Sequence, residues 1–390
     1  MWLKLLSIVP LISASLALKG YQVIEIEPKF HDDFNEIENL QESYDFLKSS
    51  RTGKSQILVS PSESKLLQGT LENLNISYEI INKNILSDIL QEKEDNDIFC
   101  VSARLGTDCY RSHSEINNYI EDLYQDIQTG HLSSKLGTPM NVVIFVDAGM
   151  HAREWISPAT GIYVIQQLVE NFEENQVFLK DFDWVVMPMI NADGYEFTRS
   201  HPDNRMWRKN RQPYTEKCTG TDLNRNFDYQ YGVSGTSSDP CVDTFKGSGP
   251  FSEPESVVLR DVLHSLKGRI SFYLTLHSYG PQFLHPWSYA KVDAPTDAEL
   301  SDVGRAGYEA VLDYSGRVYQ YGNTAKLTYA AAGESSDYAY AVAGARISIT
   351  MELPGGGKRG FDPPPKDIKE YVEESWAGIK AMAKRVIEKY

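Results

Sequence analysis

The stretch NVVIFVDAGMHAREW, residues 141–155, holds the pattern that decides the fold. Residues 141–146 form a continuous apolar run, which is typical of a strand covered on both faces of a sheet. His151 and Glu154 follow this run directly, and the next residues predict a helix that Ser157 caps, with Pro158 at its first position and its end at Phe172. A buried strand, a polar turn and then a helix indicate an α/β fold.

Two further apolar runs, at residues 184–190 and 270–276, each predict another buried strand, and the alternation of apolar and polar residues over 346–353 predicts a fourth. Asn191 and His277 come immediately after the two apolar runs. Ligands in α/β sheets bind beyond the carboxyl ends of the strands, so these polar residues are expected to gather at one edge. The expected fold is α/β, with a twisted mixed β-sheet sandwiched by helices.

Residues 18 to about 99 have the pattern of a separate small module. Strands are expected at 21–26, 56–59 and 76–81, and helices at 62–74 and 84–90. The charged run at 91–97 is expected to be an exposed linker. This order of elements predicts a small α+β, ferredoxin-like module with helices on one face of its sheet.

Residues 1–17 have the features of a secretory signal peptide. Lys4 precedes the apolar stretch 5–16, and Ser15 and Ala17 supply small residues at the cleavage positions. The alternative is an N-terminal core helix. The formal net charge of −16 argues against nucleic-acid binding, and no later segment has the length of a membrane helix. We therefore expect a secreted, extracellular protein.

The four cysteines are Cys100, Cys109, Cys218 and Cys241. An oxidising compartment would allow them to form two disulfides, for which three pairings exist. Proximity in the sequence favours Cys218–Cys241 and Cys100–Cys109. Whether Cys100 and Cys109 pair is left open by the sequence.

Two imidazoles and one carboxylate, with a fourth position open to water, suit a catalytic zinc ion. His151, Glu154 and His277 supply this set if the predicted strands bring them together. His-x-x-Glu alone is a weak signal, and His277 could instead be a hydrogen-bonded core histidine. Glu352 is harder to explain as a structural residue, because a carboxylate at the end of a core strand is unfavourable without a partner.

Five motifs, in colinear order, closely resemble those of the pancreatic-type zinc carboxypeptidases A and B. They are His151-Ala152-Arg153-Glu154-Trp155, Asp222-Leu223-Asn224-Arg225-Asn226, Leu276-His277-Ser278-Tyr279, Tyr329-Ala330-Ala331-Ala332-Gly333 and Met351-Glu352-Leu353. The resemblance extends from the end of the signal peptide to the C-terminus. It implies a signal peptide at 1–17, an inhibitory activation prosegment at 18–104 and a zinc carboxypeptidase catalytic domain at 105–390.

The resemblance also implies roles for individual residues. His151, Glu154 and His277 are expected to bind one zinc ion per chain, with Asp222 orienting His151. Glu352 is expected to be the general base, and Arg208 to stabilise the oxyanion. The implied substrate-binding residues are Arg153, Asn224, Arg225, Tyr279, Tyr329 and Ser336, of which Asn224, Arg225 and Tyr329 hold the terminal carboxylate.

By the same resemblance, the pocket for the C-terminal side chain comprises Ser288, Thr324, Ala331, Glu334 and Ser336. Family members carry an aliphatic, acidic or basic residue at the position of Ser336. The neutral serine favours an A-like preference for apolar or aromatic C-terminal residues. Glu334 stands where the family often has glycine, and if it points inward, a B-like preference for Lys or Arg is the alternative.

Two features depart from the family pattern. Between residues 127 and 141 the chain is shorter by about one β-hairpin, so two edge strands are expected to be missing. Arg104 lies between Cys100 and Cys109 and is the expected cleavage site for an activating trypsin-like protease, with Arg111 as the alternative.

The sequence therefore predicts a secreted, monomeric zinc metallocarboxypeptidase, made as a zymogen, that removes residues from the C-termini of peptides and proteins. The alternative is an inactive scaffold, destabilised by the missing hairpin. The retained zinc ligands and Glu352 favour the enzyme. A phosphate-binding loop at Gly355–Lys358 is disfavoured, because no serine or threonine follows the lysine.

Overall fold

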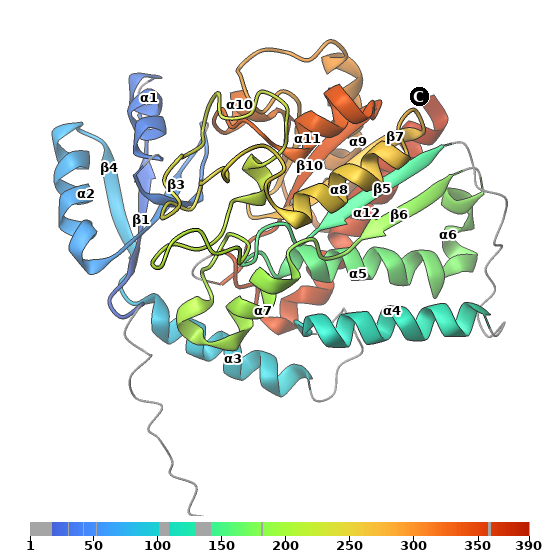
Figure 1. The fold of residues 1–390 in the computed structure, drawn as a ribbon, viewed down its shortest axis with the longest axis horizontal. Coiled ribbons are helices and arrows are strands. Elements are labelled where there is room, and N and C mark those ends of the chain that lie inside the picture. The colour runs from blue at the N-terminus through green and yellow to red at the C-terminus, as the bar shows by residue number, and fades with distance from the viewer. Residues whose placement is uncertain are drawn as a thin grey trace, which may run out of the picture.

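The computed structural model describes residues 18–29, 31–41, 43–51, 53–100, 109–128, 142–180, 182–357 and 360–389. The expected signal peptide and Arg104 lie outside these residues. The described chain contains two β-sheets, a four-stranded one in the N-terminal module (residues 18–100) and a six-stranded one in the C-terminal domain (residues 109–389). Figure 1 shows the smaller sheet, with α1 and α2, on the left of the larger one.

The six-stranded sheet has the order β6-β5-β7-β10-β8-β9. Its strands are β5 (Val143–Ala148), β6 (Asp183–Met187), β7 (Ile270–Ser278), β8 (Gln282–His285), β9 (Gln320–Asn323) and β10 (Ile347–Leu353). The pairs β5–β6, β5–β7, β7–β10 and β8–β9 are parallel, whereas β8 is antiparallel to β10. The expected mixed sheet is confirmed, and its register places Glu352 beside His277.

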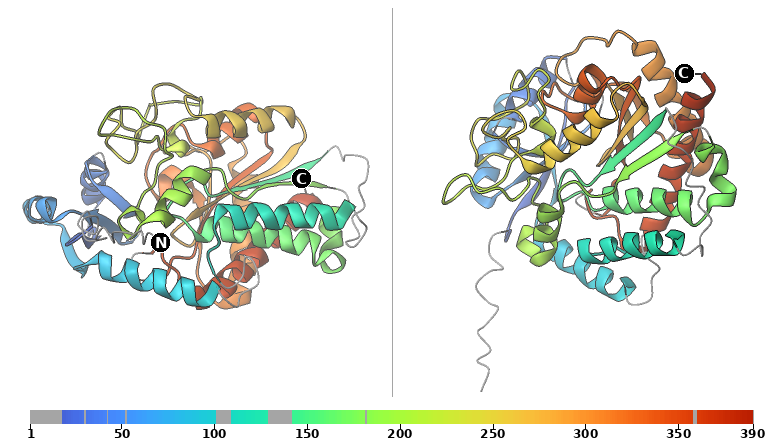
Figure 2. Two further views of the ribbon diagram at one scale, coloured as in Figure 1. Left: turned by 60° about the horizontal axis from the view of Figure 1, so that its bottom comes forward. Right: turned by 45° about the vertical axis from the view of Figure 1, so that its right-hand side comes forward.

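Helices cover both faces of this sheet, as Figures 1 and 2 show. Ile144 and Val146 of β5 face a core formed with α5 (Ile156–Val169), α9 (Asp297–Ser315) and α12 (Pro365–Lys389). Val143 and Phe145 face a second core with α8 (Pro254–Ser265). Burial on both faces explains the continuous apolar run of β5. The remaining helices of this domain are α4 (His113–Gln128), α6 (Phe172–Leu179), α7 (Ala192–Ser200), α10 (Thr324–Leu327) and α11 (Ser335–Tyr338), with single turns at Pro202–Asn204, Leu223–Arg225 and Ala339–Ala343.

The prediction that Ser157 caps the helix after β5 is wrong. The helix begins at Ile156, two residues before the expected first position, and ends at Val169. The Ser157 hydroxyl accepts the N–H of Gly149 at 2.8 Å and donates to the carbonyl of Leu276 at 2.6 Å. Through these two hydrogen bonds, Ser157 connects the turn after β5 to strand β7, next to His277.

The N-terminal module is an antiparallel sheet of order β2-β3-β1-β4 with α1 and α2 on one face and the start of α3 against the other. It comprises β1 (Gln22–Glu27), α1 (His31–Leu40), β2 (Asp45–Lys48), β3 (Ser55–Val59), α2 (Pro61–Asn73), β4 (Ser77–Asn82) and α3 (Ile85–Cys100). Ile24 and Ile57 point to α1 and α2, and form a core with Leu67. Val23 and Leu47 point the other way, into a cluster that includes Phe361 of the C-terminal domain.

The expected linker at residues 91–97 is instead part of helix α3. Glu92 and Asn96 are buried on the side of the helix that contacts the C-terminal domain. A run of charged residues resembles a solvated linker in the sequence. The helix forms because two of its polar side chains find partners more than ten residues away.

Strand β6 is the edge of the described larger sheet, and its residues are half-buried whereas those of β5 are buried. The described residues contain no strand between α4 and β5. Residues 129–141, where the missing hairpin is expected, lie outside the described part of the chain. Within the described residues, no helix has the length and apolarity that crossing a membrane requires.

Both expected disulfides are present, Cys218–Cys241 in the C-terminal domain and Cys100–Cys109 between the end of α3 and the start of that domain.

Candidate metal centre and active site

The ends of parallel strands bring the candidate metal ligands together. His151 and Glu154 lie in the turn between β5 and α5, and His277 is near the end of β7. Because Ala148 pairs with Leu276 in the sheet, the turn after β5 lies directly against His277. All three side chains are buried.

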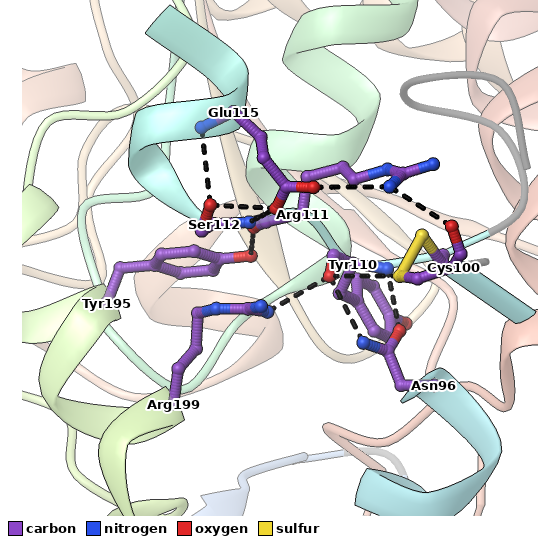
Figure 3. Close-up of a disulfide and its surroundings, with 9 residues drawn as sticks. Asn96, Cys100, Tyr110, Arg111, Ser112, Glu115, Tyr195 and Arg199 are labelled. Atoms are coloured by element: carbon purple, nitrogen blue, oxygen red, sulfur yellow. Dashed lines mark hydrogen bonds and ion pairs between the residues drawn. A yellow bond between two sulfur atoms is a disulfide. The ribbon is translucent and has the colours of Figure 1, made fainter. Parts of the chain in front are cut away.

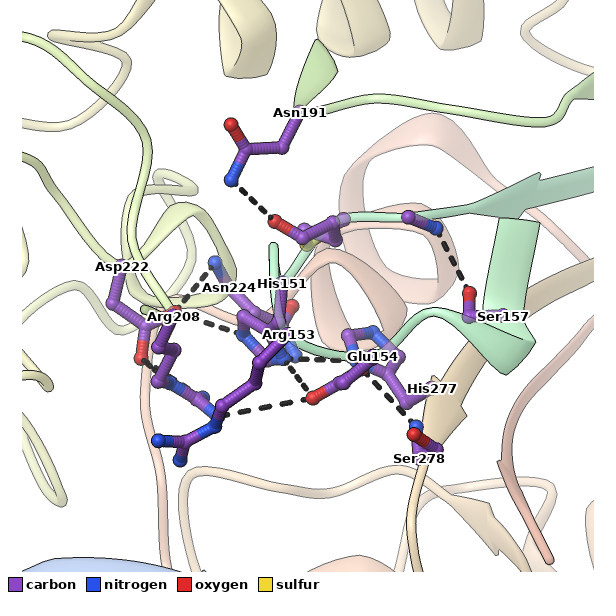
Figure 4. Close-up of polar contacts among 12 residues, drawn as sticks. His151, Arg153, Glu154, Ser157, Asn191, Arg208, Asp222, Asn224, His277 and Ser278 are labelled. Atoms are coloured by element: carbon purple, nitrogen blue, oxygen red, sulfur yellow. Dashed lines mark hydrogen bonds and ion pairs between the residues drawn. The ribbon is translucent and has the colours of Figure 1, made fainter. Parts of the chain in front are cut away.

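The three donor groups face one another, as Figure 4 shows. His151 Nδ1 lies 2.7 Å from Glu154 Oε1 and 3.2 Å from His277 Nδ1, and the latter is 3.2 Å from Glu154 Oε2. Among the described residues, these form the group of His, Cys, Asp and Glu side chains whose ligand atoms lie within 4.8 Å of one another. Zinc–nitrogen bonds of 2.0–2.1 Å in tetrahedral geometry place two ligand atoms about 3.3 Å apart. The donors thus fit a zinc ion.

Asp222 fixes the orientation of His151 from the side opposite the metal position. Its Oδ1 lies 3.0 Å from His151 Nε2, and its Oδ2 accepts a hydrogen bond from Arg208 Nε at 3.0 Å. Burial opposes ionisation of Asp222, but Arg208 and Arg225 outweigh it and hold the pKa of this carboxyl well below its usual range. The anionic form leaves His151 Nδ1 unprotonated and directed at the ion.

Glu352 lines the same cavity as His277 and Arg208. Burial, opposed by His277 and reinforced by Glu154, raises the pKa of Glu352 to about 8. A bound divalent cation would lower it, because the added positive charge favours the carboxylate. Glu352 is therefore suited to exchange a proton near neutral pH.

A second group in the cavity is suited to bind a carboxylate. Arg225 is buried and donates to Tyr329 Oη at 2.9 Å and to Glu334 Oε1 at 3.2 Å. Asn224 Oδ1 accepts the N–H of Ser335 at 2.9 Å. An anionic group of a ligand could bind Arg225 by exchanging with Glu334, since both offer the same kind of acceptor.

Ser336 lies apart from this cavity surface. It is buried, and its hydroxyl has no hydrogen-bond partner among the described residues. Thr324 and Glu334 line the cavity, whereas Ser288, Ala331 and Ser336 do not.

The N-terminal module covers the cavity. Residues 46–49, in β2 and just after it, line the cavity opposite the candidate metal ligands and leave a space of about 100 Å³. Asp45 accepts two hydrogen bonds from Arg153, and Gln56 accepts one from the hydroxyl of Tyr279. Both of these expected substrate-binding residues therefore contact the N-terminal module.

The structure brings together the expected metal ligands, Asp222, Glu352, Arg208, Asn224, Arg225 and Tyr329 around one cavity. Tyr279 also lines this cavity, whereas Arg153 lines a separate pocket, and both residues contact the N-terminal module. The sequence analysis missed Asp45, Gln56 and Asp243, which surround Arg153 and Tyr279. Their acidic or amide character was visible, but nothing local indicated which distant residues they would contact.

Comparisons with known proteins agree with this geometry. Residues 125–378 match the family described as zinc carboxypeptidase, and residues 24–92 match the carboxypeptidase activation peptide. Carboxypeptidase B of Helicoverpa zea is 41% identical over 253 residues, which cover 62% of this chain and 58% of that protein. Carboxypeptidase A1 of Mus musculus is 30% identical over 394 residues, covering 92% of each chain. The crystal structure of carboxypeptidase A from Helicoverpa armigera superposes with a TM-score of 0.86 and 27% identity, covering 95% of this chain and 98% of that one.

Proposed function

The chain belongs to the zinc carboxypeptidase family, and we propose that it is a secreted metallocarboxypeptidase that hydrolyses the C-terminal residue of peptides and proteins. One observation carries this proposal: a zinc-type ligand set, a general base and a buried arginine share one cavity. Zinc needs three protein ligands and an open position for catalysis, which His151, Glu154 and His277 provide.

In the proposed reaction, bound zinc supplies a Lewis acid that polarises the scissile carbonyl and activates water. Glu352 takes a proton from the attacking water and then gives it to the leaving amine. Arg208, held by Asp222, donates hydrogen bonds to the oxyanion that develops on the former carbonyl. Glu352 must therefore be ionised when the substrate binds.

Arg225 explains why such an enzyme would act at chain ends. With Asn224 and Tyr329 it binds the terminal carboxylate, and an internal peptide bond has no anionic group to satisfy a buried guanidinium. Substrates amidated at the C-terminus should therefore be poor.

For the C-terminal residue, the neutral Ser336 is the basis of the expected preference for apolar or aromatic side chains, although in the uncut chain its buried side chain lies outside the lining of the cavity. A second candidate preference, for Lys or Arg, is favoured by Glu334, whose buried side chain lines the cavity beside Arg225. The similar proteins include one named carboxypeptidase B and one named carboxypeptidase A1, so their names do not decide between the two preferences.

The two preferences are separated by comparing hydrolysis of peptides that end in Phe, Leu, Lys and Glu. The matched variant is Glu334→Gln, which keeps the shape and removes the charge. A charge-based preference predicts that this variant lowers the Lys-to-Phe rate ratio, whereas an unchanged ratio supports the apolar preference.

We further propose that the N-terminal module is an inhibitory prosegment, and that activation begins when a trypsin-like protease cuts at Arg104. Its cover over Glu352 and His277 supports this proposal. The enzyme is expected to be a monomer with no nucleic-acid or membrane partner.

The test is to express the full chain, treat it with trypsin, and measure zinc content and release of C-terminal residues. About one zinc ion per chain together with residue release is expected. Zinc binding without any hydrolysis after removal of the prosegment would favour the inactive scaffold instead.

A further inference from the structure

We propose that the Cys100–Cys109 disulfide keeps the prosegment attached and inhibitory after the chain is cut between these cysteines. Release of the inhibitory sheet then requires a second cut on the N-terminal side of Cys100. The inference depends on the proposed activation cut, and it makes the first product a two-chain protein in which latency persists.

The disulfide connects the last residue of α3 to the first described residue of the C-terminal domain. Figure 3 shows that it lies inside a network of hydrogen bonds. Asn96 Nδ2 donates to the carbonyl of Tyr110 at 3.1 Å, and the N–H of Tyr110 donates back to Asn96 Oδ1 at 2.8 Å. Arg111 Nη1 also donates to the carbonyl of Cys100 at 3.3 Å. The junction is therefore held by residues on both sides of the cut, independently of the residues between them.

A second contact fixes α3 one turn further from the disulfide. Glu92 accepts hydrogen bonds from Arg205 Nε at 2.9 Å and Nη2 at 2.8 Å, and both side chains are buried. The Arg205 guanidinium also lies 3.8 Å from the ring centroid of Trp155, the neighbour of metal ligand Glu154. Undocking α3 would leave a buried arginine without its carboxylate, which is unfavourable.

The same helix packs against β2, the strand of the module that lines the cavity. Ile85 and Ile89 of α3 pack in one cluster with Leu47 of β2, and with Met206 and Phe361 of the C-terminal domain. A cut after Cys100 changes none of these contacts. The strand over the cavity therefore stays in place as long as α3 does.

The tether changes the outcome through effective concentration. A segment held by a short connection faces its binding site at roughly millimolar effective concentration. A released segment in a nanomolar assay is on the order of 10^6-fold more dilute, so it dissociates unless its affinity is very high. The disulfide converts a dissociable inhibitor into one that dilution cannot remove.

Lys83 marks where the second cut would act. It is exposed in the connection between β4 and α3, outside both elements. A cut there separates the sheet that covers the cavity from the helix that carries Cys100. The final enzyme would then retain α3 as a small disulfide-linked chain.

The experiment replaces residues 102–107 of the full chain by a recognition sequence for a site-specific protease, so that only one cut is made. On a non-reducing gel the cut wild-type pair should migrate as one species, and on a reducing gel as two. Its activity should stay at least about 100-fold below that of the cut Cys100→Ser/Cys109→Ser variant after dilution. Subsequent trypsin should raise the activity of the wild-type pair, and Lys83→Gln should delay that rise relative to Lys65→Gln, an exposed lysine inside α2.

Two results would overturn the inference: a free prosegment on the non-reducing gel, or full activity of the singly cut, still-linked protein. The gel reads out attachment without any assay, so it holds even if the double-serine variant folds poorly. Failure of the proposed function looks different. In that case the protein stays inactive after the N-terminal module has been removed completely, whatever the gel shows.

Discussion

The guanidinium of Arg153 donates to both carboxylate oxygens of Asp45, at 2.8 Å and 2.9 Å, across the boundary between the two parts of the chain. Arg153 is buried, and its guanidinium lies 4.7 Å from the ring centroid of Phe361 and 3.5 Å from a carboxylate oxygen of Asp243. A residue expected to contact substrate is thus bound to the module that covers the site.

Asp45→Asn should weaken this closure. A neutral amide cannot accept two charge-assisted bonds, and truncating one partner of a buried pair typically costs 2–5 kcal/mol, so residual activity of the uncut chain should rise. The measurement is hydrolysis of a small peptide by uncut protein. Glu38→Gln is the matched control, because its pair with Lys291 is exposed and should contribute little. Equal effects of the two variants would contradict the role of Arg153.

Docking of the N-terminal module should strengthen as pH falls from 7 to 5. Burial and the nearby Asp45 raise the pKa of Asp243 to about 6 in the docked state. Undocking removes Asp45 and part of the burial, so the docked state binds more protons and is favoured when Asp243 begins to protonate. The affinity of the cut module should change by at most about tenfold per pH unit.

The readout is inhibition of the mature enzyme by added module at each pH. Asp243→Asn, which does not titrate, should remove most of the dependence between pH 7 and 5. A wild-type affinity that rises with pH would contradict the assignment.

Glu352→Gln should abolish turnover and leave the metal in place. Loss of a general base typically lowers the rate between about 100-fold and 10,000-fold. The glutamine keeps the size of the side chain and touches none of the three metal ligands in the described hydrogen-bond network. The measurement is kcat together with zinc content, and a near-normal rate with full zinc would exclude Glu352 as the base.

Asp222→Asn should weaken zinc binding. The variant removes the charge that orients His151 and neutralises Arg208, and such changes typically lower metal affinity 10–100-fold. Competition with a chelator of known affinity measures the change. If affinity stays within twofold of the wild type, the contact with His151 does not tune the metal site.

The strands that carry the site could be predicted from the sequence. β5 and β7 have long apolar runs that end at polar residues, and β10 alternates apolar and polar residues. β5, β7 and β10 all lie within about two residues of their predicted positions. Parallel pairing then determines that His151, His277 and Glu352 meet, since strand ends in one sheet share an edge. The chemistry at that edge therefore followed from the sequence.

The closure of the site could not be predicted in the same way. β2 is four residues long, begins with Asp45 and ends with Lys48, so it carries no apolar alternation that would predict a strand. Glu92 is buried only because Arg205, 113 residues later, meets it. Contacts of this kind depend on how the two modules dock. The local sequence of a charged segment is the same whether the segment is exposed to solvent or paired with a distant residue, so it does not predict the contact.

Glu352 and His277 are neighbours in register on β10 and β7, two central strands of the larger sheet. Backbone hydrogen bonds deep in the core set the spacing between the proposed base and the metal ligand, and no residue of the N-terminal module takes part in them. The proposed catalytic residues are therefore already assembled in the uncut chain, and the proposed latency would arise because the N-terminal module covers them. Activation would then need no refolding of the site, only removal of the N-terminal module that covers the cavity.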